Sequence, residues 1–352
     1  MPGGSGFPQP RDPDKEAGNA ATSRVSGVRP LLSVEGLRVE FPTRRGLLVA
    51  VDDVSFSLAP GEVLGVVGES GAGKSLTGAA IIGLIDPPGR IGAGQVVLDG
   101  RRIDNLTAEA MRRVRGREIG AVFQDPLTSL NPLYTIGRQI VETITTHLDM
   151  SPAQARRRAL DLLAEVGISA PQRRIDHYPH QFSGGMRQRV VIALALAAKP
   201  KLIIADEPTT ALDVSIQAQI IALLKRLCRD HGTAVMLITH DMGVIAETAD
   251  RVAVMYAGRI VEIGPVGDVI HQPQHPYTRG LMGSIPSIVE EREQLAQIDG
   301  AMPRLTAIPS GCPFNPRCAY AFDSCRVERP ELMSAGTSLA ACWLHASAAS
   351  VA

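Results

Sequence analysis

A glycine-rich run in the first quarter of the chain carries the residue types that bind phosphate. It fits the pattern G-x-x-x-x-G-K-[ST], and its members are Gly68, Glu69, Ser70, Gly71, Ala72, Gly73, Lys74 and Ser75. The glycines let the backbone curl so that successive N–H groups face a phosphate, while Lys74 adds a positive charge and Ser75 a hydroxyl for Mg²⁺. A β-branched run precedes the pattern and a helical one follows it. We therefore expect ATP to bind here with Mg²⁺.

Two adjacent carboxylates, Asp206 and Glu207, end the apolar run 201–205. Because neighbouring side chains of a strand point to opposite faces, we expect them to differ in role. Asp206 is suited to hold Mg²⁺, and Glu207 to polarise the attacking water as general base. Such a pair also fits a solvated turn or a helix N-cap. The phosphate loop in the same chain favours the catalytic interpretation.

A second glycine pair lies shortly before this strand, in the segment 181–189. Ser183, Gly184 and Gly185 open a helix expected to run to residue 198, with Ser183 as its cap. The segment resembles the signature of ABC-type ATPases, with Phe182 where Leu is most usual, and the resemblance extends over about residues 32–264. It implies a head-to-tail dimer in which the signature of one subunit closes on the γ-phosphate held by the other.

The resemblance also implies roles for four isolated residues. Gln124 looks like the Q-loop glutamine that reaches Mg²⁺ together with Ser75 and Asp206, and His240 like the switch histidine that contacts the γ-phosphate. Taken alone, these two are a loop amide and a hydrogen-bonded histidine at a strand end. The other two are Asp213, which resembles the D-loop aspartate but also fits a helix cap, and Phe41, which stands near the position of the adenine-stacking aromatic but also fits a strand core.

Several segments resemble one branch of the family, the dipeptide, oligopeptide and nickel importers. These are residues 67–75, 124–132, 178–185, 275–281 and 311–318. Membership implies a second, unequal ATPase subunit, two membrane permeases and an external binding protein, with this chain at the cytoplasmic face of the membrane. The expected cargo is a di- or oligopeptide, with nickel or another small solute as the alternative.

Four cysteines crowd into the last part of the chain with the spacing C-x5-C-x6-C-x16-C: Cys312, Cys318, Cys325 and Cys342. In a reducing compartment this cluster favours a metal site over disulfides. Four thiolates suit either zinc or an iron–sulfur centre, and small unligated core residues are the third possibility. In some members of the resembled branch the same cysteines are thought to hold a [4Fe–4S] cluster. Cys228, isolated on a predicted helix, is expected to serve packing.

Composition excludes other classes. Lys plus Arg and Asp plus Glu number 36 each, so the chain lacks the basic field that nucleic-acid binding requires. The longest apolar run, 190–198, is far short of the roughly 20 residues that cross a bilayer. Residues 1–30 have no apolar core of a secretion signal and are expected to form a disordered leader in a cytosolic protein.

The fold class expected is α/β, a P-loop NTPase of ABC-ATPase type with a RecA-like core, an antiparallel β subdomain and a helical subdomain near 126–190. Strands are expected at 32–41 and 50–58 as an antiparallel pair, and at 62–68, 201–205 and 234–239 in a buried parallel sheet, with helices at 74–84 and 214–229. The nucleotide-binding domain is expected over 31–264. After it, residues 265–352 show little periodicity and are expected to form a small irregular extension.

Two rival classes remain: a soluble ABC ATPase of translation or DNA repair, and a nucleotide-sensing module without turnover. The first would usually carry two ATPase cores, a long coiled-coil insertion or an N-terminal iron–sulfur domain, and none is visible in the sequence. The second would be expected to lack Glu207.

Overall fold

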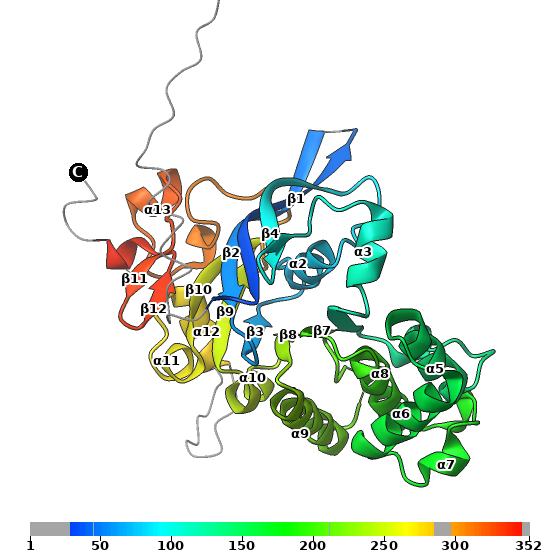
Figure 1. The fold of residues 1–352 in the computed structure, drawn as a ribbon. Coiled ribbons are helices and arrows are strands. Elements are labelled where there is room, and N and C mark those ends of the chain that lie inside the picture. Colours follow the sequence, from blue (N-terminus) through cyan, green and yellow to red (C-terminus); the bar gives the residue numbers. More distant parts are fainter. Residues whose placement is uncertain (1–28, 45, 211, 285–296, 347–352) are drawn as a thin grey trace, which may run out of the picture.

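The computed structural model describes residues 29–44, 46–210, 212–284 and 297–346. Apart from residues 29 and 30, the expected leader lies outside the described residues. Two sheets form the body of the protein, with a bundle of helices to one side and the C-terminal extension to the other (Figure 1).

The first sheet is antiparallel, in the order β2-β1-β4-β5. Its strands are β1 (Leu32–Thr43), β2 (Gly46–Leu58), β4 (Arg90–Leu98) and β5 (Arg101–Arg102). The expected pairing of the first two strands is confirmed, with Leu32 opposite Leu58. Asp99 and Gly100 join β4 to β5, and both have positive φ, as the tight turn of a two-residue hairpin requires.

The second sheet has the order β11-β12-β10-β9-β3-β8-β7-β6 and carries the functional ends. Its parallel strands are β3 (Val63–Val67), β6 (Ile119–Val122), β7 (Leu202–Asp206), β8 (Ala234–Ile238) and β9 (Arg251–Tyr256), and β10 (Arg259–Pro265) runs antiparallel to β9. Every residue of β3 and β8 is buried, as a sheet covered on both faces requires. The carboxyl ends of these parallel strands meet at one edge, where ligands of open α/β sheets bind.

Successive residues of β3 enter two different hydrophobic cores. Leu64 and Val66 pack into the core that the antiparallel sheet and α2 (Lys74–Ile81) cover. Val63 and Val67 face the opposite core, which includes α9 (Val214–His231) and α10 (Met242–Thr248). The sheet is thereby held between two apolar layers, and this arrangement fixes its functional edge.

A helical part forms the lower right of Figure 1 and connects β6 to β7. It consists of α4 (Pro126–Ser129), α5 (Ile136–His147), α6 (Pro152–Glu165), α7 (Pro171–Arg174), the 3₁₀ turn Pro179–Gln181 and α8 (Gly184–Leu196); α3 (Ala108–Val114) precedes β6. Ser151 caps α6 in a capping box with Gln154, and Pro152 occupies the first turn, so neighbouring residues determine where this helix begins.

The C-terminal extension is less irregular than its sequence indicates. It contains α11 (Val266–His271), α12 (Pro276–Gly283), α13 (Asp323–Val327), the 3₁₀ turns Asn315–Arg317 and Trp343–His345, and a hairpin of β11 (Met333–Ala335) and β12 (Ser338–Ala340). Since β12 pairs with β10, the core sheet continues past residue 264 into the extension. Three-residue strands are too short to show a period of two, so the sequence pattern missed this hairpin.

No helix in the described ranges is long and apolar enough to cross a membrane.

Candidate nucleotide site

The phosphate loop connects the carboxyl end of β3 to the N-terminus of α2. Gly68 has φ +152°, and a Cβ at this position would lie 2.2 Å from the carbonyl oxygen of Met255. The Lys74 ammonium is folded back into the loop, where it donates to the carbonyl oxygens of Gly68 at 2.7 Å and Glu69 at 3.1 Å. Glycine at position 68 is therefore a steric requirement, and the loop encloses a cation where phosphate oxygens would be received.

Lys74 is almost completely buried, with 5% of its surface exposed. Burial lowers the pKa of its ammonium, and the carboxylates of Glu207, Asp206 and Glu69 act in the opposite direction. The surroundings of Lys74 thus provide negative charge but little water, a setting in which a bound polyphosphate interacts strongly with the lysine.

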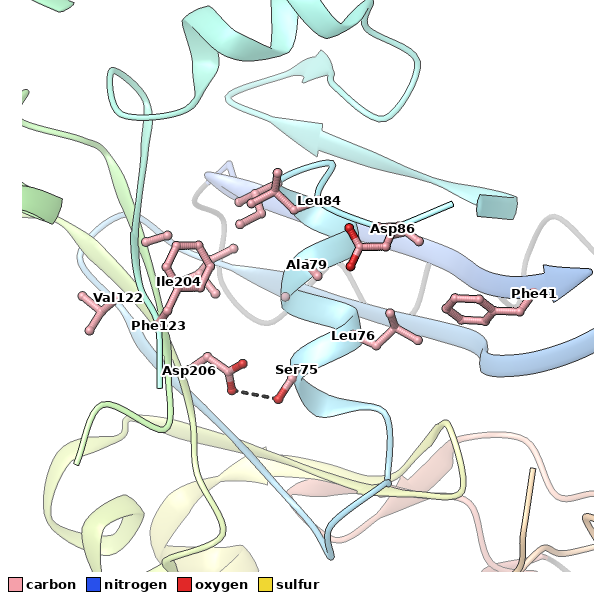
Figure 2. A pocket seen from close by; sticks show the side chains of 14 residues that line it. Phe41, Ser75, Leu76, Ala79, Leu84, Asp86, Val122, Phe123, Ile204 and Asp206 are labelled. Carbon is pink, nitrogen blue, oxygen red and sulfur yellow. Dashed lines mark hydrogen bonds between the residues drawn. The ribbon is translucent and has the colours of Figure 1, made fainter. Parts of the chain in front are cut away.

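Asp206, the last residue of β7, lies beside the phosphate loop. Figure 2 shows its carboxylate bonded to Ser75, whose hydroxyl donates to Oδ1 at 2.9 Å. Burial raises the pKa of Asp206 and the hydrogen bond from Ser75 opposes this effect. A carboxylate and a hydroxyl oxygen in direct contact are the kind of hard ligands that Mg²⁺ takes, so this pair fits the ion.

Glu207 leaves the strand pattern on which its predicted orientation rested. Its φ is +45°, in the left-handed region, and β7 has already ended at Asp206. The Glu207 N–H donates to the carbonyl oxygen of Ile238 at 2.8 Å, which holds this conformation at the end of β8. The alternation argument is therefore wrong for Glu207: the two carboxylates differ because the chain turns there and gives them different partners.

The Glu207 carboxylate contacts two of the predicted residues and one that the sequence did not reveal. Gln124 donates its Nε2 to Oε2 at 3.1 Å, and Nδ1 of His240 lies 3.3 Å from Oε1. Thr210 also donates its hydroxyl to Oε2, at 2.8 Å. A threonine three residues after a carboxylate carries no motif signal, which explains why it was missed.

The pKa of Glu207 is lowered. Burial raises it, but the hydrogen bonds from Thr210 and His240 together with the charges of His240 and Lys74 outweigh burial. Glu207 is consequently ionised at neutral pH and accepts hydrogen bonds through both oxygens. It can orient a water molecule by accepting its hydrogen bond.

An open pocket of about 710 Å³ brings most of these residues together. It is lined by Ala50, Ser70, Gly71, Gly73, Lys74, Ser75, Leu76, Gln124, Glu207, His240 and Leu305. The phosphate loop, the Q-loop residue, the candidate base and the histidine thus face one space, although they come from four separate parts of the sequence.

The chain matches two family models, "ABC transporter" over residues 51–210 and "Oligopeptide/dipeptide transporter, C-terminal region" over residues 261–325. It is 49% identical over 302 residues to the dipeptide transport ATP-binding protein DppD of Escherichia coli, which covers 86% of this chain and 92% of that protein. The chain belongs to the ABC transporter ATPases. The oligopeptide transport ATP-binding protein OppD of Salmonella typhimurium is 47% identical, over 92% of this chain and 96% of its own length.

Two solved structures of ATP-binding cassettes have the same fold as this chain. The ATP-binding cassette MJ0796, described as a dimer in a post-hydrolysis state with ADP and Pi, has a TM-score of 0.60 at 30% identity, covering 67% of this chain and 98% of the cassette. CbiO1 of Clostridium perfringens has the same TM-score at 27% identity, over 69% of this chain and 91% of its own. As an ABC ATPase, the protein hydrolyses ATP and uses Mg²⁺.

The signature residues of this ABC ATPase are not among those lining its own Lys74 pocket. Ser183 caps α8 by accepting from the Met186 N–H, as predicted. A Cβ on Gly185 would lie 2.8 Å from Ile216, so the signature packs against the start of α9. Asp213 stands at the N-cap position of α9, but its side chain makes no capping hydrogen bond.

Phe41 is not among the residues that line the Lys74 pocket. It lines a neighbouring, mainly apolar pocket of about 360 Å³, where its ring lies beside Leu76 (Figure 2). A Cβ on Gly89 would lie 2.4 Å from the Phe41 ring, so the ring is packed on the β subdomain. Phe41 is thus a partly buried residue of β1, and its stacking on adenine stays a prediction.

The four clustered cysteines of the extension lie around one small cavity of about 20 Å³, together with His275, Phe314 and Trp343. Such a space is about that of one water molecule and does not fit a four-iron cluster. Within the described residues, no group of three or more His, Cys, Asp or Glu side chains is arranged to hold a metal ion. The four thiols do line one cavity, as their clustering in the sequence indicated. In this structure, however, they are not arranged as ligands of one metal centre. Cys228 is buried on α9, as expected.

Proposed function

We propose that this ABC ATPase powers the import of short peptides. One observation carries the proposal: the ABC core and the oligopeptide/dipeptide C-terminal region occur together in a chain whose relatives are named as dipeptide and oligopeptide transport proteins. Those relatives match along nearly their full length, so the likeness includes the extension as well as the ATPase core. The substrate itself would be selected by other subunits.

The active unit that we propose is a head-to-tail dimer with a second, non-identical ATPase. The separation of Ser183 from the Lys74 pocket supports it, because the signature of one subunit then has to complete the pocket of another. The dimeric state of the similar cassette MJ0796 supports the same arrangement. Two permeases and an external binding protein would complete the importer, with this chain at the cytoplasmic face of the membrane and no nucleic acid involved.

In the proposed reaction the loop amides and Lys74 bind the phosphates of ATP. Ser75, Asp206 and Gln124 would hold Mg²⁺, which neutralises charge on the phosphate oxygens when bound. Glu207 orients the attacking water and accepts its hydrogen bond, and His240 contacts the terminal phosphate from the end of β8. Ser183, Gly184, Gly185 and Asp213 act on the nucleotide of the partner subunit. ATP binding closes the dimer and hydrolysis reopens it.

A [4Fe–4S] or zinc centre at Cys312, Cys318, Cys325 and Cys342 is a separate proposal. The support is that these four thiols line one cavity. Ligation would require the cavity to widen, because the thiols now enclose about the space of one water molecule. The centre would tie down the extension and takes no part in the proposed hydrolysis.

The test is a purification of tagged Glu207→Gln protein from native membranes with ATP, followed by identification of its partners. Two permeases, a sister ATPase and an external binding protein support the importer, and uptake of a labelled dipeptide into vesicles holding this complex supports the peptide cargo. Uptake of nickel without uptake of peptide would change the assigned cargo from peptide to nickel. Recovery of ribosomes or repair factors would overturn the importer proposal.

A further inference from the structure

A segment of the C-terminal extension contributes to the nucleotide pocket. Leu305, half-buried, lines the same space as Lys74 and Ser75. Three residues earlier, Met302 packs against both hydrophobic cores, and its Cε lies 3.1 Å from where a Cβ on Gly71 would be. The extension thus reaches the phosphate loop itself, more than 230 residues away along the chain.

Arg317 joins this segment to the loop. Its guanidinium donates to the carbonyl oxygens of Asp299 at 2.8 Å, Ile298 at 3.2 Å and Gly300 at 3.4 Å. The same side chain pairs with the Glu69 carboxylate at 3.0 and 3.2 Å, and only 7% of it is exposed. A planar guanidinium with five donors can bridge a carboxylate and several carbonyls at once, which a lysine cannot do.

Three aromatic rings pack next to this contact. Tyr256 and Tyr277 have ring centroids 4.6 Å apart, and Phe314 lies 5.3 and 5.5 Å from them. The Glu69 N–H donates to the Tyr277 hydroxyl at 2.9 Å, and Arg317 donates to the Tyr256 hydroxyl at 3.4 Å. The position of Glu69 in the phosphate loop therefore depends on residues of the core and of the extension together.

We infer that Leu305 forms the wall of the pocket that covers the base or ribose of ATP, and that Arg317 is the positioning residue that holds this wall in place. The inference rests on the proposed ATP site. Only Ala50, Leu76 and Leu305 among the lining residues have apolar side chains, and the aromatic residue Phe41 is not one of them. An apolar side chain gains nothing from facing a triphosphate, whereas covering a base or sugar removes apolar surface from water.

The deciding experiment is calorimetric titration of the full-length protein with Mg-ATP and, separately, with magnesium tripolyphosphate, which lacks base and ribose. Leu305→Ala is expected to weaken ATP binding about fivefold to tenfold and to leave tripolyphosphate binding within about twofold of wild type. Arg304→Ala, at the exposed neighbouring position, is the matched control and should change neither affinity.

Arg317→Ala is expected to show the same selective loss, with a rise in the KM for ATP larger than any fall in kcat. Arg317→Lys should restore little, since lysine can pair with Glu69 but cannot bridge to the three carbonyls. Thermal unfolding of each variant checks that it folds, and Leu305→Ala tests the wall even if the Arg317 variants do not.

Unchanged ATP affinity in Leu305→Ala overturns the inference, and so does an equal loss for ATP and tripolyphosphate, which would indicate a distorted phosphate loop. The ATP site itself is judged separately by Lys74→Ala, which should weaken both ligands. If the wild-type protein binds neither Mg-ATP nor magnesium tripolyphosphate, that result contradicts the proposed ATP site, and not specifically the role of Leu305.

Discussion

Gln124 and Glu207, 83 positions apart in the chain, meet through a hydrogen bond of 3.1 Å from Nε2 to Oε2. The glutamine follows β6 and the glutamate follows β7, and these two strands are neighbours in the parallel sheet. The contact connects the candidate base to the start of the helical part. A movement of the helical part that displaces Gln124 would therefore change the hydrogen bonding of the Glu207 carboxylate.

Glu207→Gln should retain ATP binding and lose most turnover. The amide oxygen can still accept from Gln124 and Thr210, but it carries no charge with which to polarise water. We expect kcat to fall by roughly 10² to 10⁴, measured as phosphate release, while ATP affinity stays within about twofold. Turnover like that of wild type would reject Glu207 as the water-orienting residue.

Thr210→Val should alter the pH dependence of turnover. The Thr210 hydroxyl lowers the pKa of Glu207, so its removal raises that pKa towards or above its ordinary value. Glu207 would then be protonated at a higher pH, and the acidic limb of the kcat profile should move upward. Thr209→Val, one residue earlier, is the matched control. A profile that does not move would show that Glu207 ionisation does not limit turnover.

Lys74→Ala should weaken nucleotide binding itself. The substitution removes the cation that the loop encloses and leaves the carbonyl oxygens of Gly68 and Glu69 without their present donor. A bond to a charged group contributes about 1.5–3 kcal/mol, so we expect at least a tenfold rise in Kd for Mg-ATP. The measurement is a direct titration, and an unchanged Kd would count against the phosphate-loop assignment.

Cys318→Ser tests the metal proposal. Protein purified without oxygen is assayed for iron, sulfide and zinc, with Cys228→Ser as a control at a buried cysteine outside the cluster. If the four thiols bind a metal, the Cys318 variant loses most of it and the Cys228 variant retains it. Wild-type protein that contains neither metal would reject ligation and leave the cysteines as small core residues.

His275→Asn should reduce the acid sensitivity of the fold. The His275 ring is fully buried, which together with nearby His345 lowers its pKa to about 3. Below the unfolded-state value of about 6.5 the unfolded chain takes up a proton that the folded chain does not, so stability falls as pH falls, by up to about 1.4 kcal/mol per unit. Asparagine can still cap α12, as His275 does by accepting from the Tyr277 N–H.

Buried Glu262 has the opposite effect on the pH dependence of stability. Burial raises its pKa, so the folded chain binds a proton there more readily than the unfolded chain, and this contribution to stability grows as the pH falls. The informative quantity is therefore the difference between wild type and His275→Asn in the free energy of unfolding, compared at pH 7 and pH 5. A difference that does not depend on pH would contradict a neutral buried histidine.

Local sequence was sufficient to predict features that are formed by residues a few positions apart in the chain. The phosphate loop needs glycines, one lysine and one hydroxyl within eight consecutive residues, and the strand before it and the helix after it are encoded beside it. The cap at Ser151 and the turn at Asp99-Gly100 are likewise decided by neighbours a few positions apart. The sequence by itself therefore determined the fold class, the family and the position of the phosphate loop.

Tertiary structure decided what depends on contacts between distant segments. The left-handed turn at Glu207, its bond from Thr210, the packing of Phe41 away from the Lys74 pocket and the pairing of β12 with β10 arise from the way strands and loops meet in space. Arg317 and Leu305 belong to no recognisable motif: Arg317 pairs with Glu69 and Leu305 lines the Lys74 pocket only because the extension folds back towards the phosphate loop. Side-chain packing and backbone closure over such distances are not encoded in any local pattern.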